Sequence, residues 1–254
     1  MSRMHRAGMA VVIGALVAGA AGRAQAQIQG MPLFTNPRYA TGFRVHADLG
    51  LPTDKNVGLG DYSVIQGGVT FALGPVGIGA NVGATRDNFK TLTSGVTTYN
   101  VGNQTKVTAS ALAQIRVYGG GLSPWSLSLF GGASMDVKAY DFASLPDSIK
   151  NTYLGGSSKV LTIPAGVALG LKLPLVIISP NIWAAPRFNF TKILNCPSGS
   201  VCPNSKAEFR WAVGVDVPIF KIISVRAAFD SGKLYGQTVN NFGVGASIGI
   251  GGMR

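Results

Sequence analysis

His46 and Asp48 are the two residues of this chain whose types and spacing best fit acid–base chemistry. Residues two apart in an extended strand share one face, so the imidazole and the carboxylate would lie side by side. An imidazole oriented by a carboxylate can act as a general base in hydrolysis. No serine nucleophile is identified by its spacing to this pair, and a lone histidine in a polar network is more often structural. We therefore expect no enzymatic activity, with hydrolysis by His46 as a distant alternative.

The two cysteines of the chain, Cys196 and Cys202, lie close together in a stretch rich in proline and serine. Two nearby cysteines in an exported chain predict a disulfide bond, which would stiffen one loop. Two thiolates alone are too few ligands for a structural zinc site. We expect no metal site and no cofactor.

Residues 1–26 have the three parts of a secretory signal peptide. Two arginines and a histidine give a positive start, residues 7–22 form an apolar run, and residues 24–26 read Ala-Gln-Ala, a small-x-small cleavage site. The run is shorter than the roughly 20 residues that a transmembrane helix needs. We expect cleavage before Gln27 and export of the remaining chain.

The composition is apolar for an exported chain, with 46% hydrophobic and 13% charged residues. No second apolar run is long enough to span a membrane as a helix, and the 35 glycines do not follow the period of collagen. A β-barrel reconciles these features, because a closed sheet satisfies its own backbone hydrogen bonds inside a bilayer.

Without residues 1–26 the chain keeps 19 basic and 10 acidic residues, a net charge of about +9. A basic balance often indicates nucleic-acid binding, but we expect none here, because the chain is exported and its bases are spread out. Several bases fall in polar stretches, where they suit either anionic lipid head groups of the bilayer or simple solubility. They are Lys55, Lys90, Lys150, Lys159, Lys192, Lys206 and Lys233.

Tight reversals, mostly marked by proline, alternate with long polar stretches from Pro75 onward. The tight reversals lie at 73–76, 122–125, 173–175 and 218–221, and the polar stretches lie near 52–61, 88–104, 139–159, 191–206 and 231–239. Alternation of apolar and polar residues, the period of a β-strand, flanks each reversal. Short turns at one end and long loops at the other are typical of transmembrane β-barrels.

About ten strands are predicted, at 39–51, 62–74, 76–87, 105–118, 125–138, 160–173, 175–190, 207–218, 222–230 and 240–251. The predicted fold class is all-β, a closed antiparallel up-and-down transmembrane barrel within residues 38–254, preceded by an irregular periplasmic lead-in at 27–37. Pro164, Pro180 and Pro186 fall inside two predicted strands, and proline cannot donate to a ladder. They indicate bulges or misplaced boundaries, and eight strands are the alternative count.

The predicted strand 207–218 shows how the two faces divide. Phe209, Trp211 and Val213 share one face, whereas Glu208 and Arg210 share the other. In a membrane barrel the apolar face turns outward to lipid, whereas a soluble barrel would turn it inward around a lipocalin-like cavity. We expect the apolar face outward and a polar network in the lumen. The predicted lumen residues are Arg44, His46, Asp48, Gln66, Asn81, Lys106, Gln114, Arg116, Asp136, Lys138, Lys172, Asn181, Arg187, Glu208, Arg210, Asp216, Arg226 and Asp230.

Aromatic residues near the ends of the predicted strands favour the membrane barrel, because they match interfacial girdles. Those near the tight reversals are Tyr39, Phe71 and Trp125, and those toward the polar stretches are Phe188, Phe190, Phe209, Phe229 and Phe242.

The pattern resembles that of small bacterial outer-membrane β-barrels of the OmpA-type or porin-like class, over nearly the whole chain after residue 26. Such barrels usually end in a Gly-x-x-apolar-x-aromatic signal. Here Gly245, Ile248 and Ile250 keep the spacing with aliphatic residues, and Arg254 ends the chain. No peptidoglycan-binding domain follows the predicted barrel. The resemblance implies a location in the bacterial outer membrane, with the short turns in the periplasm and the long loops outside.

The leading expectation for function is a structural barrel or a narrow, mildly anion-favouring pore. Bases exceed acids in the predicted lumen, and basic linings select for anions. Ten strands lie close to the size at which side chains fill the interior, so a wide porin is not expected. The alternative is surface interaction or adhesion through the loops 139–159 and 191–206, and a hydrolase at the barrel rim is a distant third.

Overall fold

The computed structural model describes residues 31–38, 41–53, 61–88, 91–94, 97–100, 103–120, 123–138, 159–174, 179–194, 205–220, 222–234 and 237–250. The predicted signal peptide, the predicted disulfide and most of the loops 139–159 and 191–206 lie outside the described residues. The surface-interaction hypothesis that rests on these loops therefore stays a prediction. None of the described residues forms a helix of the length and apolarity required to cross a membrane.

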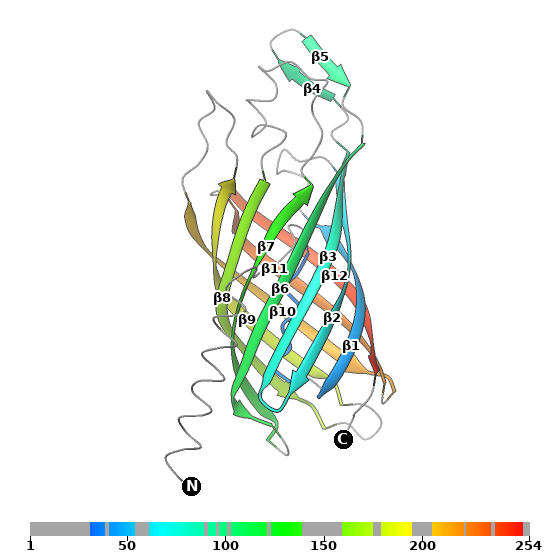
Figure 1. Ribbon diagram of the computed structural model, residues 1–254, viewed down its shortest axis with the longest axis vertical. Coiled ribbons are helices and arrows are strands. Elements are labelled where there is room, and N and C mark those ends of the chain that lie inside the picture. The colour runs from blue at the N-terminus through cyan, green and yellow to red at the C-terminus, as the bar shows by residue number, and fades with distance from the viewer. Residues whose placement is uncertain are drawn as a thin grey trace.

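Ten long antiparallel strands close into one barrel (Figure 1). They are β1 (Gly42–Pro52), β2 (Asp61–Leu73), β3 (Val76–Asn88), β6 (Asn103–Gly119), β7 (Trp125–Lys138), β8 (Lys159–Lys172), β9 (Asn181–Leu194), β10 (Lys206–Pro218), β11 (Ile223–Leu234) and β12 (Gln237–Ile250). Strands β4 (Thr91–Ser94) and β5 (Thr97–Asn100) form a separate hairpin beyond the barrel (Figure 1). The all-β closed barrel and its count of ten strands are confirmed, and the eight-stranded alternative is wrong.

The two ends of the barrel differ, and we name them the turn end and the loop end. At the turn end, Phe43 near the start of β1 pairs with Ile250 at the end of β12, which closes the barrel. At the same end Leu73 pairs with Val76 across a two-residue turn. Gly74 in that turn has φ of 59°, a conformation that glycine adopts without steric cost. The β4–β5 hairpin lies beyond the opposite, loop end (Figure 1).

The wide loop expected near 231–239 is wrong. Strands β11 and β12 remain paired as far as Leu234 and Gln237, so that only residues 235 and 236 separate them. Polar residues are compatible with a strand that extends beyond the bilayer, because its backbone groups still bond to the neighbouring strand. Low apolarity there marks the end of the lipid-facing band and not the end of the strand.

The three prolines act in two different ways. Pro180 lies just before β9, which begins at Asn181, so the predicted strand start at 175 and the tight turn at 173–175 are wrong. Pro164 and Pro186 stay inside β8 and β9. The pairing of β7 with β8 is interrupted beside Pro164, and that of β8 with β9 beside Pro186, where the missing N–H removes a ladder bond.

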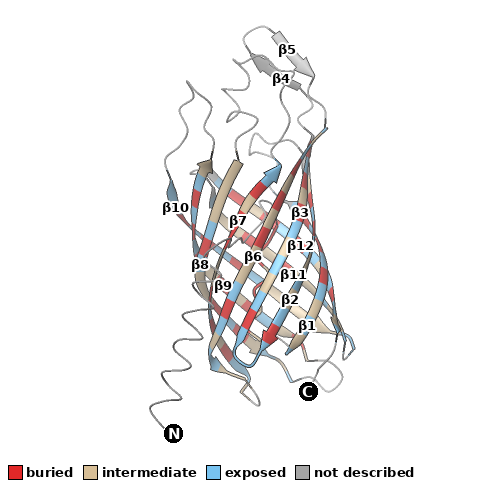
Figure 2. Cartoon of the chain, in the orientation of Figure 1, coloured by how far each residue is buried: buried red, intermediate tan, exposed pale blue. Residues whose placement is uncertain are grey.

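The barrel wall is apolar outside and polar inside, the reverse of a soluble protein. Buried and exposed residues alternate along the strands (Figure 2). Large apolar side chains are exposed on every strand of the barrel, as with Ile65 at 62% and Ile248 at 52%. Most of the buried side chains of the wall are charged or polar. This arrangement is that of a transmembrane barrel, and it confirms that the apolar face turns outward.

The predicted aromatic residues lie on this outer wall. Phe71 and Trp125 are exposed near the turn end, and the exposed ones of the loop half are Phe188, Phe190, Phe209 and Phe242. Phe229 is partly buried against Trp211, with ring centroids 5.7 Å apart. Tyr39 lies outside the described residues.

Candidate functional site

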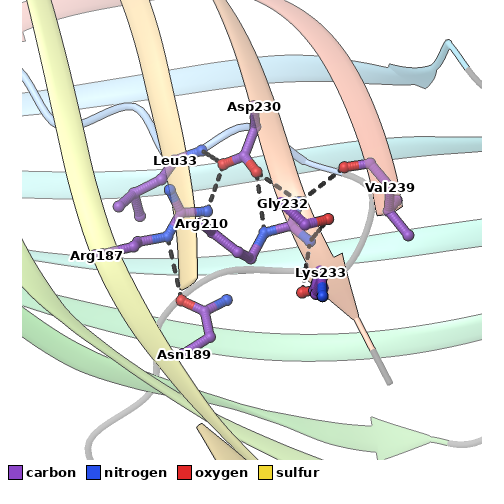
Figure 3. Close-up of polar contacts among 8 residues, drawn as sticks. All are labelled: Leu33, Arg187, Asn189, Arg210, Asp230, Gly232, Lys233 and Val239. Atoms are coloured by element: carbon purple, nitrogen blue, oxygen red, sulfur yellow. Dashed lines mark hydrogen bonds and ion pairs between the residues drawn. The ribbon is translucent and has the colours of Figure 1, made fainter. Parts of the chain in front are cut away.

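Two arginines share one buried carboxylate in the loop half of the lumen (Figure 3). Arg210 donates to Asp230 Oδ1 from Nε at 3.1 Å and from Nη2 at 2.6 Å, and Arg187 Nη2 donates to Asp230 Oδ2. Arg187 Nε also donates to Asn189 Oδ1 at 3.2 Å, and the backbone N–H of Leu33 donates to Asp230 Oδ2 at 3.3 Å. Buried charges are tolerated when they are paired and hydrogen-bonded, so the cluster holds β9, β10 and β11 together.

A second ion pair joins β1 to β11. Arg226 donates to Asp48 from Nε to Oδ1 at 2.7 Å and from Nη2 to Oδ2 at 2.5 Å, a bidentate geometry. Gln66 Nε2 donates to Asp48 Oδ2 at 2.9 Å. The guanidinium carbon of Arg226 also lies 4.5 Å from the centroid of the Phe34 ring, which adds a cation–π contact.

A third cluster lies near the loop end of β6, β7 and β8. Lys106 Nζ lies 3.6 Å from Asp136 Oδ1, to which Thr108 Oγ1 donates at 2.8 Å. The backbone N–H of Val160 donates to Asp136 Oδ2 at 3.0 Å. Each carboxylate of the three clusters thus connects several strands of the barrel wall.

His46 belongs to the polar network of the lumen. It lies in the middle of β1 and is 7% exposed, with Nε2 2.6 Å from Asn81 Oδ1 and 3.8 Å from Asp48 Oδ2. The hydrolase hypothesis requires a histidine near the rim, and the structure places His46 well inside instead. Among the described residues, no group of three or more His, Cys, Asp or Glu side chains is arranged to hold a metal ion.

Ser247 lies directly across the β1–β12 pair from His46, so the expectation that the sequence holds no serine with nucleophile spacing is wrong. It is the central residue of Gly245-Ala246-Ser247-Ile248-Gly249, which has the Gly-x-Ser-x-Gly spacing of a hydrolase nucleophile. That motif works on a sharp strand-to-helix turn, whereas these residues lie within β12. Ser247 Oγ bonds to Ser224 Oγ at 2.7 Å and accepts from Arg44 at 3.2 Å, while His46 bonds to Asn81.

Residues 31–38 lie inside the barrel, where they form what we call the lumen segment. The segment has no helix or strand, as expected, but it occupies the lumen rather than the predicted periplasmic position. Met31 packs against Val64 of β2, and Thr35 is fully buried. At the turn end Arg38 donates to the carbonyl oxygens of Ser123 and Trp125, the latter at 3.2 Å. The segment therefore passes from the loop half of the lumen to the turn end.

The wall holds the lumen segment by polar and apolar contacts. Gln114 Nε2 donates to the carbonyl oxygen of Asn36 at 3.0 Å, and Ser128 Oγ donates to that of Pro37 at 3.2 Å. Leu33 packs in a buried apolar cluster inside the lumen. The wall residues of this cluster are Phe130, Ala168, Trp183, Ala185, Ala212 and Ala228.

Large apolar residues at lumen positions were the sequence signal for this segment. Phe130 of β7 and Trp183 of β9 are buried at positions where alternation predicts a lumen-facing side chain. A water-filled lumen does not favour such residues, so they indicate that something apolar lies against them. Trp183 Nε1 donates to Asp216 Oδ2 at 2.9 Å, which satisfies its polar atom.

Beside the lumen segment, and mainly in the turn half of the lumen, lies a cavity of about 400 Å³, which we name the vestibule. Pro218 and Phe220 border it at the turn end, and Phe34 of the lumen segment lies on its wall. Its charged lining is mainly basic, with Arg38, Arg44, Lys172 and Arg226 against Asp216. Arg44 Nη1 donates to Ser224 Oγ at 2.9 Å. A small anion entering from the turn end would meet an excess of positive charge.

The predicted lumen residues occupy three kinds of position. The buried ones are His46, Asp48, Gln66, Lys106, Gln114, Asp136, Arg187, Glu208, Arg210 and Asp230. The partly buried ones are Arg44, Asn81, Arg116, Asn181, Asp216 and Arg226. Lys138 and Lys172 are exposed, because each is the last residue of its strand and lies at an open end of the barrel.

Comparison with known proteins identifies the fold. No protein-family model and no curated protein matches the chain. Solved structures match over most of it. The β domain of the Bordetella autotransporter BrkA is 10% identical, with 84% of this chain and 100% of that chain covered and a TM-score of 0.52. The translocator domain of the autotransporter NalP from Neisseria meningitidis is 13% identical, with 84% and 90% covered and a TM-score of 0.45.

The outer membrane phospholipase A from Escherichia coli also matches, at 11% identity, with 83% of this chain and 93% of that chain covered and a TM-score of 0.31. A fold by itself assigns no activity. At these identities the likeness concerns the fold alone, and that fold is the outer-membrane β-barrel.

Proposed function

We propose that the protein is a structural β-barrel of the bacterial outer membrane whose lumen is a narrow, anion-favouring pore held closed by the lumen segment. The position of the lumen segment is the observation that carries this proposal. Met31, Leu33 and Thr35 are buried within the barrel, and the segment bonds to β6, β7 and β11. A backbone bonded to several sides of a ten-stranded barrel leaves little room for a continuous water path.

The membrane location rests on the outer wall. Apolar side chains are exposed around the barrel, aromatic residues lie toward both ends, and charged residues are mostly inside. An apolar surface of this extent is unfavourable in water on a monomeric protein, whereas the hydrocarbon core of a bilayer favours it. With the turn end in the periplasm and the loop end outside, the vestibule opens toward the periplasm.

The anion preference rests on the vestibule. Arg38, Arg44 and Lys172 line it together with Arg226, which Asp48 already neutralises. Positive rings in a narrow passage favour anions over cations. We assign no catalytic role to His46, since its hydrogen bond to Asn81 makes it part of the structural network.

Removal of residues 31–37 should turn a closed barrel into a conducting one. In planar bilayers, the chain beginning at Gln27 should show rare or no discrete current steps. The deletion variant should show discrete steps, with a reversal potential in a salt gradient on the anion side. The reason is that the deletion removes the groups that fill the lumen but no residue of the barrel strands.

Two results would contradict this prediction. A folded deletion variant without current would remove the pore and leave only the structural role. Steady current through the undeleted chain would show that the lumen segment does not close the barrel. As a matched control, Arg44→Gln and Lys172→Gln in the deletion variant should keep the steps and weaken the anion preference.

A further inference from the structure

The charged side chains are distributed differently between the lumen and the outer wall of the barrel. Every acidic side chain that the structure describes lies in the lumen: Asp48, Asp87, Asp136, Glu208, Asp216 and Asp230. Among the residues whose side-chain burial the structure describes, which leaves out Asp61 at the start of β2, the charged side chains of the outer wall are basic, namely Arg86, Lys159, Lys192 and Lys233. All four lie within the last few residues of their strands at the loop end. Outer-wall positive charge is therefore confined to one rim of the membrane band.

Three of these bases lie on one side of the barrel, on β8, β9 and β11. Leu161 pairs with Lys192, and Lys159 pairs with Leu194, so the two lysines are diagonal neighbours on the outer face. Lys233 follows Gly232, which pairs with Arg210 of the intervening strand β10. Arg210 also pairs with Arg187, so Lys233 is level with Phe188 of β9, which is four residues from Lys192 and six from Leu194. With strands about 4.8 Å apart and a rise of about 3.3 Å per residue, the backbone positions of Lys159 and Lys233 are roughly 25 Å apart.

An aromatic surface lies next to these lysines on the same strands. Phe188 and Phe209 meet edge to face with centroids 5.6 Å apart, and Trp211 lies 5.7 Å from Phe229. Phe190 is 50% exposed, with the same outward direction as Lys192 two residues later. Together with Lys159, Lys192 and Lys233, these five aromatic residues form what we call the rim patch.

The rim patch is not simply part of a uniform girdle. On the other side of the barrel, the exposed large apolar residues of the loop half are aliphatic, as at Leu49, Ile65, Val82 and Val137. Arg86 of β3 is a rim base on that aliphatic side. A girdle that only anchors the barrel at the interface would be aromatic all round. A cluster of aromatic and cationic side chains on one side of the barrel suits the binding of one amphipathic, anionic molecule.

We propose that the rim patch binds a phosphorylated glycolipid of the outer leaflet, of the lipid A type. This inference rests on the proposed function, because it requires the loop end to face outward in an outer membrane. The lysines bind phosphate groups, and the aromatic rings pack against the sugar and the first carbons of the acyl chains. A lipid with several phosphates on a disaccharide matches charges distributed over β8 to β11. A phospholipid with one phosphate would engage only one or two of the lysines.

Native mass spectrometry of the full chain in a neutral detergent tests the proposal. The two probes are bis-phosphorylated lipid A and phosphatidylglycerol. Each is titrated against the wild type, against a triple variant that combines Lys159→Gln, Lys192→Gln and Lys233→Gln, and against the control Arg86→Gln. Each lysine near a lipid head group raises the affinity about fivefold, so the triple variant should bind lipid A about 100-fold more weakly. The Arg86→Gln control should change the affinity by less than about twofold.

Wild-type affinity for lipid A in the triple variant would overturn the proposal. Equal affinity of wild type for phosphatidylglycerol and lipid A would also overturn it, because the patch would then recognise any anionic lipid. Each sample is first shown to be folded by its change in gel mobility on boiling. Bilayer currents recorded without lipid A test the proposed function separately, and the triple substitution should leave them unchanged.

Discussion

Asp230→Asn should lower the free energy of unfolding by about 3–5 kcal/mol, because it leaves two buried guanidinium groups without their shared carboxylate. The Asp230 side chain is fully buried, and those of Arg187 and Arg210 are no more than 4% exposed. Both arginines are buried in the lumen, so the uncompensated charge would lie in a region of low polarity. Urea titration of the barrel folded in lipid vesicles measures the loss.

A second variant separates this electrostatic effect from a change in packing. Replacing all three residues, as Arg187→Met, Arg210→Met and Asp230→Leu, removes the two guanidinium groups together with their shared carboxylate. Buried ion clusters replaced in this way are often neutral or more stable. We expect the triple variant to regain most of the stability lost by Asp230→Asn. If Asp230→Asn lowers the free energy of unfolding by less than about 1 kcal/mol, Asp230 is not the partner that the arginines require.

Gly243→Leu should displace the lumen segment and open the barrel without shortening the chain. A Cβ built on Gly243 would lie 2.8 Å from Pro32 Cδ and 3.1 Å from Phe34 Cζ, both in the lumen segment. Overpacking of this kind costs about 1–3 kcal/mol. If the segment yields and the strands do not, the open population rises about 5-fold to 150-fold, by the relation of tenfold for each 1.4 kcal/mol.

The readout is the frequency of discrete current steps in planar bilayers, compared with wild type. Gly79→Leu is the matched control, because its added Cβ would meet Thr70 of the wall, at 3.0 Å, instead of the lumen segment. The control should leave the frequency of the steps near that of wild type. Equal frequencies for Gly243→Leu and Gly79→Leu would mean that displacement of the segment does not open the lumen.

The wall of the barrel was largely predictable because its pattern is local. The strand predicted at 125–138 coincides with β7, and most of the other strands agree within a few residues. The alternation of apolar and polar residues within one strand indicates which side chains face lipid. Because lipid is a nearly uniform environment, this signal does not depend on the neighbouring strands. The strand predicted at 175–190 failed because proline was the competing signal. Pro174 and Pro180 end the pairing there, whereas Pro186 is tolerated.

The lumen was predictable as a set of residues but not as an arrangement. His46 and Asp48 share a face, as the sequence indicates, yet the partner of Asp48 is Arg226, 178 residues away. The sequence has no local signal for that pairing, because strand register and closure of the barrel decide it. Residues 31–38 lack strand alternation, and their bond from Leu33 to Asp230 joins residues 197 positions apart.

The sequence by itself therefore determined the barrel, its inside and its outside, since these depend on a period of two within each strand. Only the tertiary structure decided which charges neutralise one another, that the lumen segment fills the interior, and that lysines and aromatic rings meet on one side of the rim. Those features arise from closure, which brings residues of distant strands to the same height around a common axis.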